Sequence, residues 1–277
     1  MKIRLTLIAL ALLLSAPVAA QDLTVISYNI RYNSDGDGDD LWDLRKAELV
    51  EQIKAHEPSS FGVQEATHTQ MLYLAESLPD YAYVGVGRDD GSTKGEYSAI
   101  FYQKARFEVL QSGTFWLSDT PQQISTGWDA ALPRICTYAQ LKERASARQF
   151  WHFNTHFDHM GQEARAESAT LIINEIKRLT EPESALVVTG DFNAQPQELP
   201  IVRMKEAMID PLDQLELKGP MGTFSGFQLD APLDRRIDYI FVQGLNPTSY
   251  EHLGEKRANG RWISDHLAVK IKVIPIN

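Results

Sequence analysis

Short apolar runs alternate with longer amphipathic segments along nearly the whole chain, and this alternation restricts the fold more than any other feature of the sequence. We predict strands at residues 23–28, 98–102, 150–154, 186–189, 237–242 and 267–273. Helices are predicted at residues 43–55 and 162–179, and apolar residues recur near helical spacing in the second. Strands and helices that interleave in this way indicate an α/β or mixed fold.

Polar residues follow several predicted strands at the point where each strand ends. They are Asn29, Glu65, His156, Asp158, Asp191 and Asn193. Ligands and catalytic groups in α/β sheets gather at the carboxyl ends of strands, so a functional site is predicted there. Asp238 differs because it lies inside the predicted strand at residues 237–242. A carboxylate in that position needs a metal or a cationic partner, such as a protonated histidine, to offset its burial.

The pentapeptide Gly190-Asp191-Phe192-Asn193-Ala194 directly follows an apolar run. A buried strand would therefore deliver a carboxylate and an amide to a loop. This pair suits phosphate chemistry on a metal ion, because hard divalent ions prefer oxygen ligands. Gly, Asp and Asn also form ordinary turns, so the pentapeptide alone leaves both interpretations open.

The first 20 residues have the pattern of a cleaved secretory signal. Lys2 and Arg4 precede an apolar stretch, and small residues end it at Ala20. Cleavage after Ala20 predicts a periplasmic or secreted protein with one domain at residues 21–277. The apolar stretch is too short to cross a bilayer about 30 Å thick, and no later stretch approaches ~18 apolar residues. We therefore expect no stable membrane insertion.

The chain is acidic, with a formal net charge of −10 at pH 7. An acidic surface repels polyanions at long range, which counts against a general nucleic-acid binder but allows a local basic patch. Residues 144–148 come nearest to such a patch. Acidity also favours the recruitment of cations, and a phosphate ester can enter once metal ions neutralise part of the field.

Six short motifs, in this order, resemble the endonuclease/exonuclease/phosphatase superfamily. They are Ser27-Tyr28-Asn29, Gln64-Glu65, Asn154-Thr155-His156, Gly190-Asp191-Phe192-Asn193, Arg236-Ile237-Asp238-Tyr239 and Ser264-Asp265-His266. The resemblance spans nearly the whole chain beyond the signal. It implies a four-layer α/β sandwich, in which two mixed β-sheets pack face to face between outer helices. It also implies phosphoester hydrolysis at a site that uses Mg²⁺ or Mn²⁺.

The resemblance further implies which side chains hold the metal and the attacking water. Glu65 looks like the principal metal ligand, and Asn29 and Asp265 would complete the site directly or through water. Asp191 and Asn193 resemble the pair that positions the water and the phosphoryl oxygens.

The same resemblance implies roles for two histidines. His266 is similar to the histidine that acts on the nucleophile or stabilises the pentavalent phosphorus, and Asp238 would hold its ring in one tautomer. His156 would donate to a phosphate oxygen or to the leaving group. Arg134 is a candidate phosphate clamp, because a guanidinium matches phosphate oxygens; a surface ion pair is the alternative.

Further local signatures resemble the bacterial, exported, metal-dependent hydrolase branch of the superfamily. They comprise Trp42 with Arg45, residues 115–118, residues 127–134, and residues 157–161 with Ala164 and Arg165. Within them, His159 and Arg165 either face the site or pair along the following helix. Phe224 and Phe227 either stand beside the substrate or pack.

We therefore expect an exported phosphoesterase, monomeric, that hydrolyses mono- or diesters of small organic phosphates by in-line attack of water. A secreted nuclease is the alternative, and a sphingomyelinase-type phosphodiesterase comes third. A non-catalytic binding module on the same fold would usually lose motif residues, whereas every motif position is occupied in this sequence.

Overall fold

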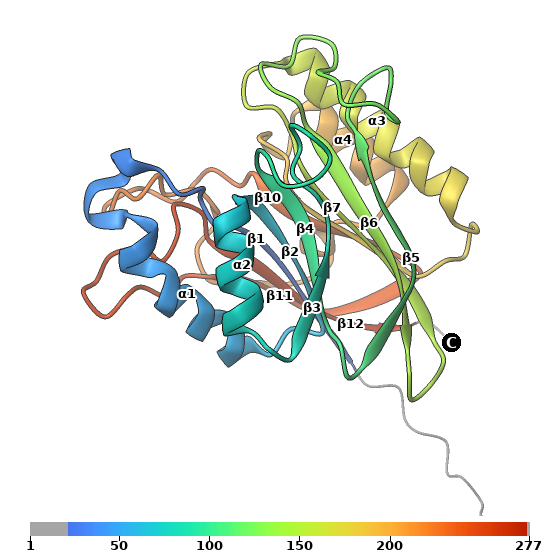
Figure 1. Ribbon diagram of the computed structural model, residues 1–277. Helices are drawn as coiled ribbons and strands as arrows, with labels where there is room; N and C mark the ends of the chain where they lie inside the picture. Colours follow the sequence, from blue (N-terminus) through green and yellow to red (C-terminus); the bar gives the residue numbers. More distant parts are fainter. Residues whose placement is uncertain (1–21, 276–277) are drawn as a thin grey trace, which may run out of the picture.

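Two β-sheets pack face to face, and helices cover both outer faces (Figure 1). This computed structural model describes residues 22–275. The predicted signal segment, residues 1–20, lies outside the described residues, as do the ends of the predicted domain at residues 21 and 276–277. Within the described range, the four-layer sandwich of two mixed sheets is confirmed.

The larger sheet has seven strands in the order β3-β4-β2-β1-β12-β11-β9. Their bounds are Leu23–Asn29 for β1, Ser60–Ala66 for β2, Tyr81–Val84 for β3, Tyr97–Gln103 for β4, Leu217–Lys218 for β9, Leu245–Leu253 for β11 and Ala268–Pro275 for β12. β1 and β2 run parallel, while β12 runs antiparallel to β1. The carboxyl ends of β1 and β2 therefore lie at the edge where β12 begins.

The smaller sheet has five strands in the order β10-β8-β7-β6-β5. Their bounds are Phe107–Trp116 for β5, Ile135–Glu143 for β6, Gln149–His156 for β7, Leu186–Asp191 for β8 and Asp238–Gln243 for β10. β7 and β8 are parallel, and β10 is antiparallel to β8 with Asp238 opposite Asp191. Asp238 is thus the first residue of its strand.

Two helices cover each sheet (Figure 1). Helices α1 (Trp42–His56) and α2 (His68–Ser77) lie on the larger sheet, and α3 (Gln162–Leu179) and α4 (Leu199–Ala207) lie on the smaller one. Short 3₁₀ helices occupy Asp35–Asp40 and Pro211–Asp213. In residues 22–275 we find no helix with the length and apolarity that crossing a membrane requires.

Apolar side chains fill three layers, one between the sheets and one beneath each pair of helices. Phe61 and Leu74 belong to the layer under α1 and α2, and Phe153 and Ile172 belong to the layer under α3 and α4. Strand residues of both sheets form the middle layer. Burial of these layers provides the main favourable term for folding.

A buried amide also links the two sheets. Asn154 on β7 is fully buried, and its Nδ2 donates to the carbonyl oxygens of Val63 and Ala99 on the larger sheet, both at 2.9 Å. Gly62 lets the sheets approach here, because a Cβ at that position would lie 2.4 Å from the Asn154 Oδ1. The Asn154 of the Asn-x-His motif therefore joins the sheets and does not line the site.

Candidate active site

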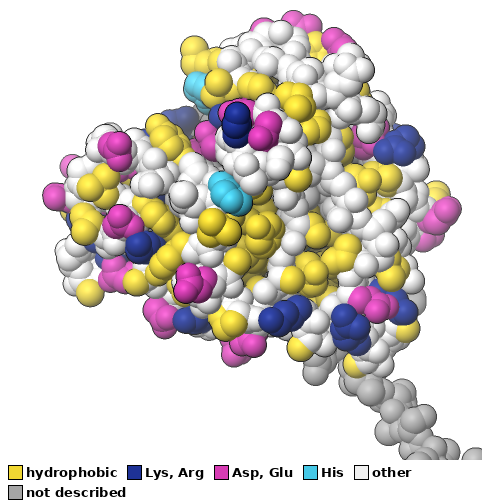
Figure 2. Space-filling view, in the orientation of Figure 1, with side chains coloured by type: hydrophobic (Ala, Val, Ile, Leu, Met, Phe, Trp, Pro, Cys, Tyr) yellow, Lys and Arg dark blue, Asp and Glu magenta, His cyan; other side chains and the backbone are white. Residues whose placement is uncertain are grey.

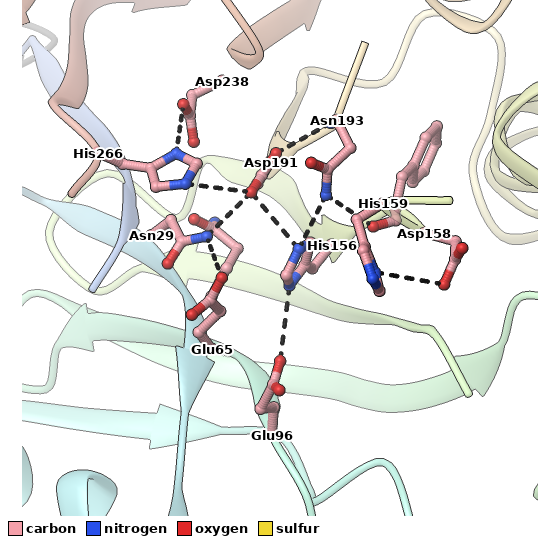
Figure 3. A network of polar contacts seen from close by, with 12 residues as sticks. Asn29, Glu65, Glu96, His156, Asp158, His159, Asp191, Asn193, Asp238 and His266 are labelled. Atoms are coloured by element: carbon pink, nitrogen blue, oxygen red, sulfur yellow. Dashed lines mark hydrogen bonds and ion pairs between the residues drawn. The ribbon is translucent and has the colours of Figure 1, made fainter. Parts of the chain in front are cut away.

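The predicted polar residues converge at one edge of the sandwich, as Figure 3 shows. Asn29, at the end of β1, donates from Nδ2 to Glu65 Oε1 at 3.0 Å and to Asp191 Oδ2 at 2.9 Å. Glu65 lies at an irregularity in β2 with a φ of 64°, and the backbone N–H of Tyr32 donates to its Oε2 at 3.1 Å. One amide thus holds the carboxylates of both sheets side by side.

The orientation of Asn29 bears on its predicted role as a metal ligand. Its Oδ1 accepts from the backbone N–H of Arg31 at 3.0 Å, so the oxygen faces away from Glu65 and Asp191. For Asn29 to ligate an ion between the carboxylates through Oδ1, its amide would have to turn over and give up the contact with the Arg31 N–H. Direct ligation by Asn29 stays a prediction.

His266 lies two residues before the start of β12 and is fixed by Asp238. Its Nδ1 lies 2.9 Å from Asp238 Oδ2, and its Nε2 lies 3.7 Å from Asp191 Oδ2. Burial opposes a charge on this ring, but the carboxylates of Asp238 and Asp191 outweigh burial and raise the pKa of His266 well above its usual value. The ring therefore presents a protonated Nε2 to the site.

His156 faces the site from the end of β7. Asn193 donates from Nδ2 to the Phe157 carbonyl at 3.1 Å, and the same nitrogen lies 3.1 Å from His156 Nε2. Nε2 therefore accepts, and the neutral ring carries its proton on Nδ1. Asp191 Oδ1 in turn accepts from the backbone N–H of Asn193 at 2.9 Å, which fixes the geometry of the loop.

Asp265 lies beside this group but apart from its centre. Its Oδ2 is 4.0 Å from the Nε of Arg31, and its Oδ1 accepts from the Ser264 hydroxyl at 3.4 Å. Burial raises the pKa of Asp265 to about 6. The structure brings Asp265 to the same cavity as Glu65, and its role as a metal ligand stays a prediction.

Glu65, Asp191 and His266 lie close enough together for a metal ion to bind among them, although His266 could be a ligand only after its Nε2 lost the proton. One ligand atom from each of Glu65, Asp191 and His266 lies within 4.8 Å of the other two. The set combines Glu65 with two residues that we predicted to be catalytic, and it leaves out Asp265. Burial, reinforced by Asp238, raises the pKa of Asp191 to about 7, so this carboxylate lacks enough positive charge around it. A divalent cation with oxygen ligands fits such a site.

A cavity of about 520 Å³ opens over these residues. Its lining also includes Arg31, Tyr32, Glu96, Leu132, Arg134, His159, Phe224 and Arg235. Arg134 is 4% exposed and pairs with Asp158 at 3.2 Å, so the ion pair that we considered for it exists but is buried. Phe224 lies edge-on to His266, whereas Phe227 packs near the guanidinium of Arg45.

Sequence reasoning missed Glu96 and Arg88, which flank the site from the loop before β4. Both nitrogens at the end of Arg88 pair with Glu96, at 2.8 and 2.9 Å, and Glu96 Oε2 lies 3.7 Å from His156 Nδ1. The loop is held by turns and glycines and follows no predicted apolar strand. The sequence therefore carried no signal for these residues.

Basic side chains form no continuous stripe on the face drawn in Figure 2, where they lie among acidic ones. Arg144, from the segment nearest to a basic patch, lies 3.4 Å from Glu108, and Lys142 lies 3.0 Å from the same carboxylate. These pairs reduce the positive potential that a polyanion would meet at this segment.

Comparison with known proteins supports a family assignment. A family model described as the endonuclease/exonuclease/phosphatase family matches residues 26–266. A structure from that family in Bacteroides thetaiotaomicron is 36% identical, covers 94% of this chain and 100% of its own, and superposes with a TM-score of 0.89. A mannosyl-6-phosphatase of the same organism is 36% identical over 91% of this chain and 99% of its own, with a TM-score of 0.86.

A curated relative from a virus is more distant. The uncharacterized protein L388 of Acanthamoeba polyphaga mimivirus is 29% identical over 180 residues, which are 62% of this chain. The chain spans 66% of that protein's length, and it spans 30% of Drosophila melanogaster nocturnin, which is 24% identical. Together with the site geometry, the family match shows that this chain belongs to the endonuclease/exonuclease/phosphatase family, whose members are divalent-metal-dependent hydrolases.

Proposed function

We propose that this protein is an exported phosphoesterase that uses Mg²⁺ or Mn²⁺ to hydrolyse mono- or diesters of small organic phosphates. The observation that carries the proposal is the meeting of Glu65, Asp191 and His266 in a cavity whose wall includes Arg134. A cavity of about 520 Å³ suits a small ester. The similarity to a mannosyl-6-phosphatase favours sugar phosphates among small esters.

A bound divalent ion would polarise a phosphoryl oxygen and stabilise the departing oxygen. Glu65 and Asp191 would hold it, with Asp265 as a further carboxylate of the same cavity. In our assignment the amide of Asn193 and the carboxylate of Asp191 orient the attacking water in line with the leaving group. These two side chains are fixed relative to each other by the loop after β8.

The two histidines would both act on the phosphoryl group, since the Nε2 atoms of His156 and His266 lie 3.4 and 3.7 Å from the same oxygen, Asp191 Oδ2. His266 would donate from Nε2 toward the oxygens that gain negative charge, because Asp238 accepts from its Nδ1 and keeps the ring protonated. His156 carries its proton on Nδ1, the atom on the side of Glu96, and would donate a hydrogen bond from there to a phosphate oxygen or to the leaving group, with Asn193 fixing the ring at Nε2. This protein reaches its substrates outside the cytoplasm if the segment ending at Ala20 is a cleaved signal.

The test is phosphate release by the purified chain with Mg²⁺ or Mn²⁺, in wild type and in Glu65→Ala. The panel holds sugar phosphates, nucleotides, a diester dye, single-stranded nucleic acid and sphingomyelin. We expect turnover of small esters that falls by about 100-fold or more in the variant. Glu76→Ala, an exposed glutamate on α2, is the matched control and should leave turnover unchanged.

Other outcomes would contradict the proposal. Cleavage restricted to nucleic acid would make the protein a nuclease, and cleavage restricted to sphingomyelin would make it a lipid phosphodiesterase. Equal turnover in wild type and Glu65→Ala would remove the assigned metal site.

A further inference from the structure

We propose that Arg134 and His159 form a two-armed clamp for a terminal phosphate, and that this clamp makes the enzyme prefer phosphate monoesters to diesters. The inference rests on the proposed function, because it takes Glu65, Asp191 and His266 as the reaction centre. Both arms line the cavity that contains these three residues.

Arg134 is buried in a fixed orientation, in which two of its three guanidinium nitrogens have hydrogen-bond partners. Its Nε donates to Asp158 Oδ2 at 3.2 Å, and its Nη2 lies 3.0 Å from His159 Nδ1. Its Nη1 has no hydrogen-bond partner among residues 22–275. A buried guanidinium nitrogen without a partner is costly, and a phosphate oxygen in the cavity would supply the missing acceptor.

Arg134 also fixes the tautomer of His159, the second arm of the clamp. A guanidinium nitrogen can only donate, so His159 Nδ1 accepts from Arg134 and the neutral ring carries its proton on Nε2. The His159 side chain is half exposed. The Nε2–H group of His159 can therefore donate to an anion in the cavity.

The loop between β7 and α3 holds this pair rigid. Asp158 Oδ1 accepts from the backbone N–H groups of Met160 and Gly161, both at 2.9 Å. Burial opposes the charge on Asp158, but these N–H groups and Arg134 outweigh it and lower the pKa of the carboxyl to about 2. Asp158 thus remains charged, and it anchors Arg134 at any physiological pH.

Three further signature residues support the same loop. Arg165 donates from Nη1 to the Asp158 carbonyl at 3.1 Å, so it braces the clamp from α3 and does not face the reaction centre. Asp129 caps α3 by accepting from the N–H of Ala164 at 2.7 Å. Gly161 permits this cap, because a Cβ there would lie 2.5 Å from Asp129 Oδ1.

A monoester suits a cavity lined by both the cluster and the clamp better than a diester does. A terminal phosphate has three free oxygens and a charge of about −1.5 to −2 near pH 7. It can therefore reach the carboxylate and histidine cluster with some oxygens and the clamp with another. A diester has one free oxygen fewer. Its second ester group would take the position of the phosphate oxygen that accepts hydrogen bonds from the clamp.

The experiment compares the ratio of kcat/KM for p-nitrophenyl phosphate to kcat/KM for bis-p-nitrophenyl phosphate. We expect His159→Ala and Arg134→Lys each to lower this ratio by about 10-fold or more, because each removes a charge-assisted or directional contact to one oxygen. Arg134→Lys keeps a cation beside Asp158 and so protects the fold. Met160→Ala, on the same loop and 67% exposed, should leave the ratio unchanged.

A second measurement separates the clamp from the proposed function. Inorganic phosphate binding, followed by calorimetry with Mg²⁺ present, should weaken about 10-fold or more in His159→Ala even if no ester is turned over. The clamp would be refuted if the variants lost both ester activities in equal proportion. It would also be refuted if folded His159→Ala and Arg134→Lys bound phosphate as tightly as the wild type. If the wild type hydrolyses no ester but its phosphate binding depends on His159, the proposed function is refuted and the clamp is supported.

Discussion

Truncation of Asn154 to alanine should destabilise the protein severely without touching the site. Its Oδ1 accepts from Gln64 Nε2 at 2.7 Å and from the Thr189 hydroxyl at 2.8 Å, in addition to the two bonds that its Nδ2 donates to the opposite sheet. The side chain is 0% exposed. Asn154→Ala therefore removes four hydrogen bonds, three of which join the two sheets.

The four partners of Asn154 differ in whether another hydrogen-bond partner remains for them. Gln64 can still reach the Ser27 hydroxyl at 3.3 Å, and Thr189 can still donate to the Phe153 carbonyl at 3.3 Å. The carbonyls of Val63 and Ala99 lose this donor outright. Each of these two carbonyls left without its donor should cost about 1–3 kcal/mol. The free energy of unfolding should therefore fall by roughly 4 kcal/mol in total. Such a loss lowers Tm by roughly 8–16 °C in a protein of this size.

The assay is urea unfolding followed by circular dichroism, with Tm from a thermal scan. Asn174→Ala, an exposed residue on α3, is the matched control and should change stability by less than about 0.5 kcal/mol. The isosteric Asn154→Asp separates hydrogen bonding from volume, because it places a carboxyl opposite two carbonyl oxygens. A loss below about 1 kcal/mol in both variants would refute the reasoning that this amide holds the sheets together.

Three further predictions follow from the site and the core. Asp238→Asn removes the carboxylate that raises the pKa of His266, and kcat should fall about 100-fold while the fold survives in circular dichroism; undiminished kcat would contradict the assigned role. Addition of Mg²⁺ at 100 times its dissociation constant should stabilise the chain by about 2.7 kcal/mol, and Glu65→Ala should abolish that shift in thermal scans. Burial lowers the pKa of His152 to about 3, so below about pH 6.5 the unfolded chain binds a proton that the folded protein does not. Stability should therefore fall toward pH 3 by up to about 1.4 kcal/mol per pH unit, and His152→Gln should flatten this slope in acid titrations; an unchanged slope would exclude His152 as the cause.

Elements with strong periodicity were predictable. The range predicted for the second helix coincides with α3, and each of the six predicted strands overlaps an observed strand. β5 was not predicted, because it is an edge strand whose middle faces solvent, with Leu110 44% exposed. An edge strand of this kind shows little of the alternation that marks a half-buried strand.

The sequence by itself determined which polar residues could meet within each sheet, because parallel strands bring their carboxyl ends to one edge. That reasoning placed Asn29 beside Glu65 on the larger sheet and His156 beside Asp191 on the smaller one, and the packing of the two sheets then brought the pairs together. Tertiary structure alone decided that Asn154 joins the sheets, that Arg134 is buried against Asp158, and that Glu96 approaches His156. These outcomes depend on contacts between segments that are distant in sequence, which local periodicity cannot encode.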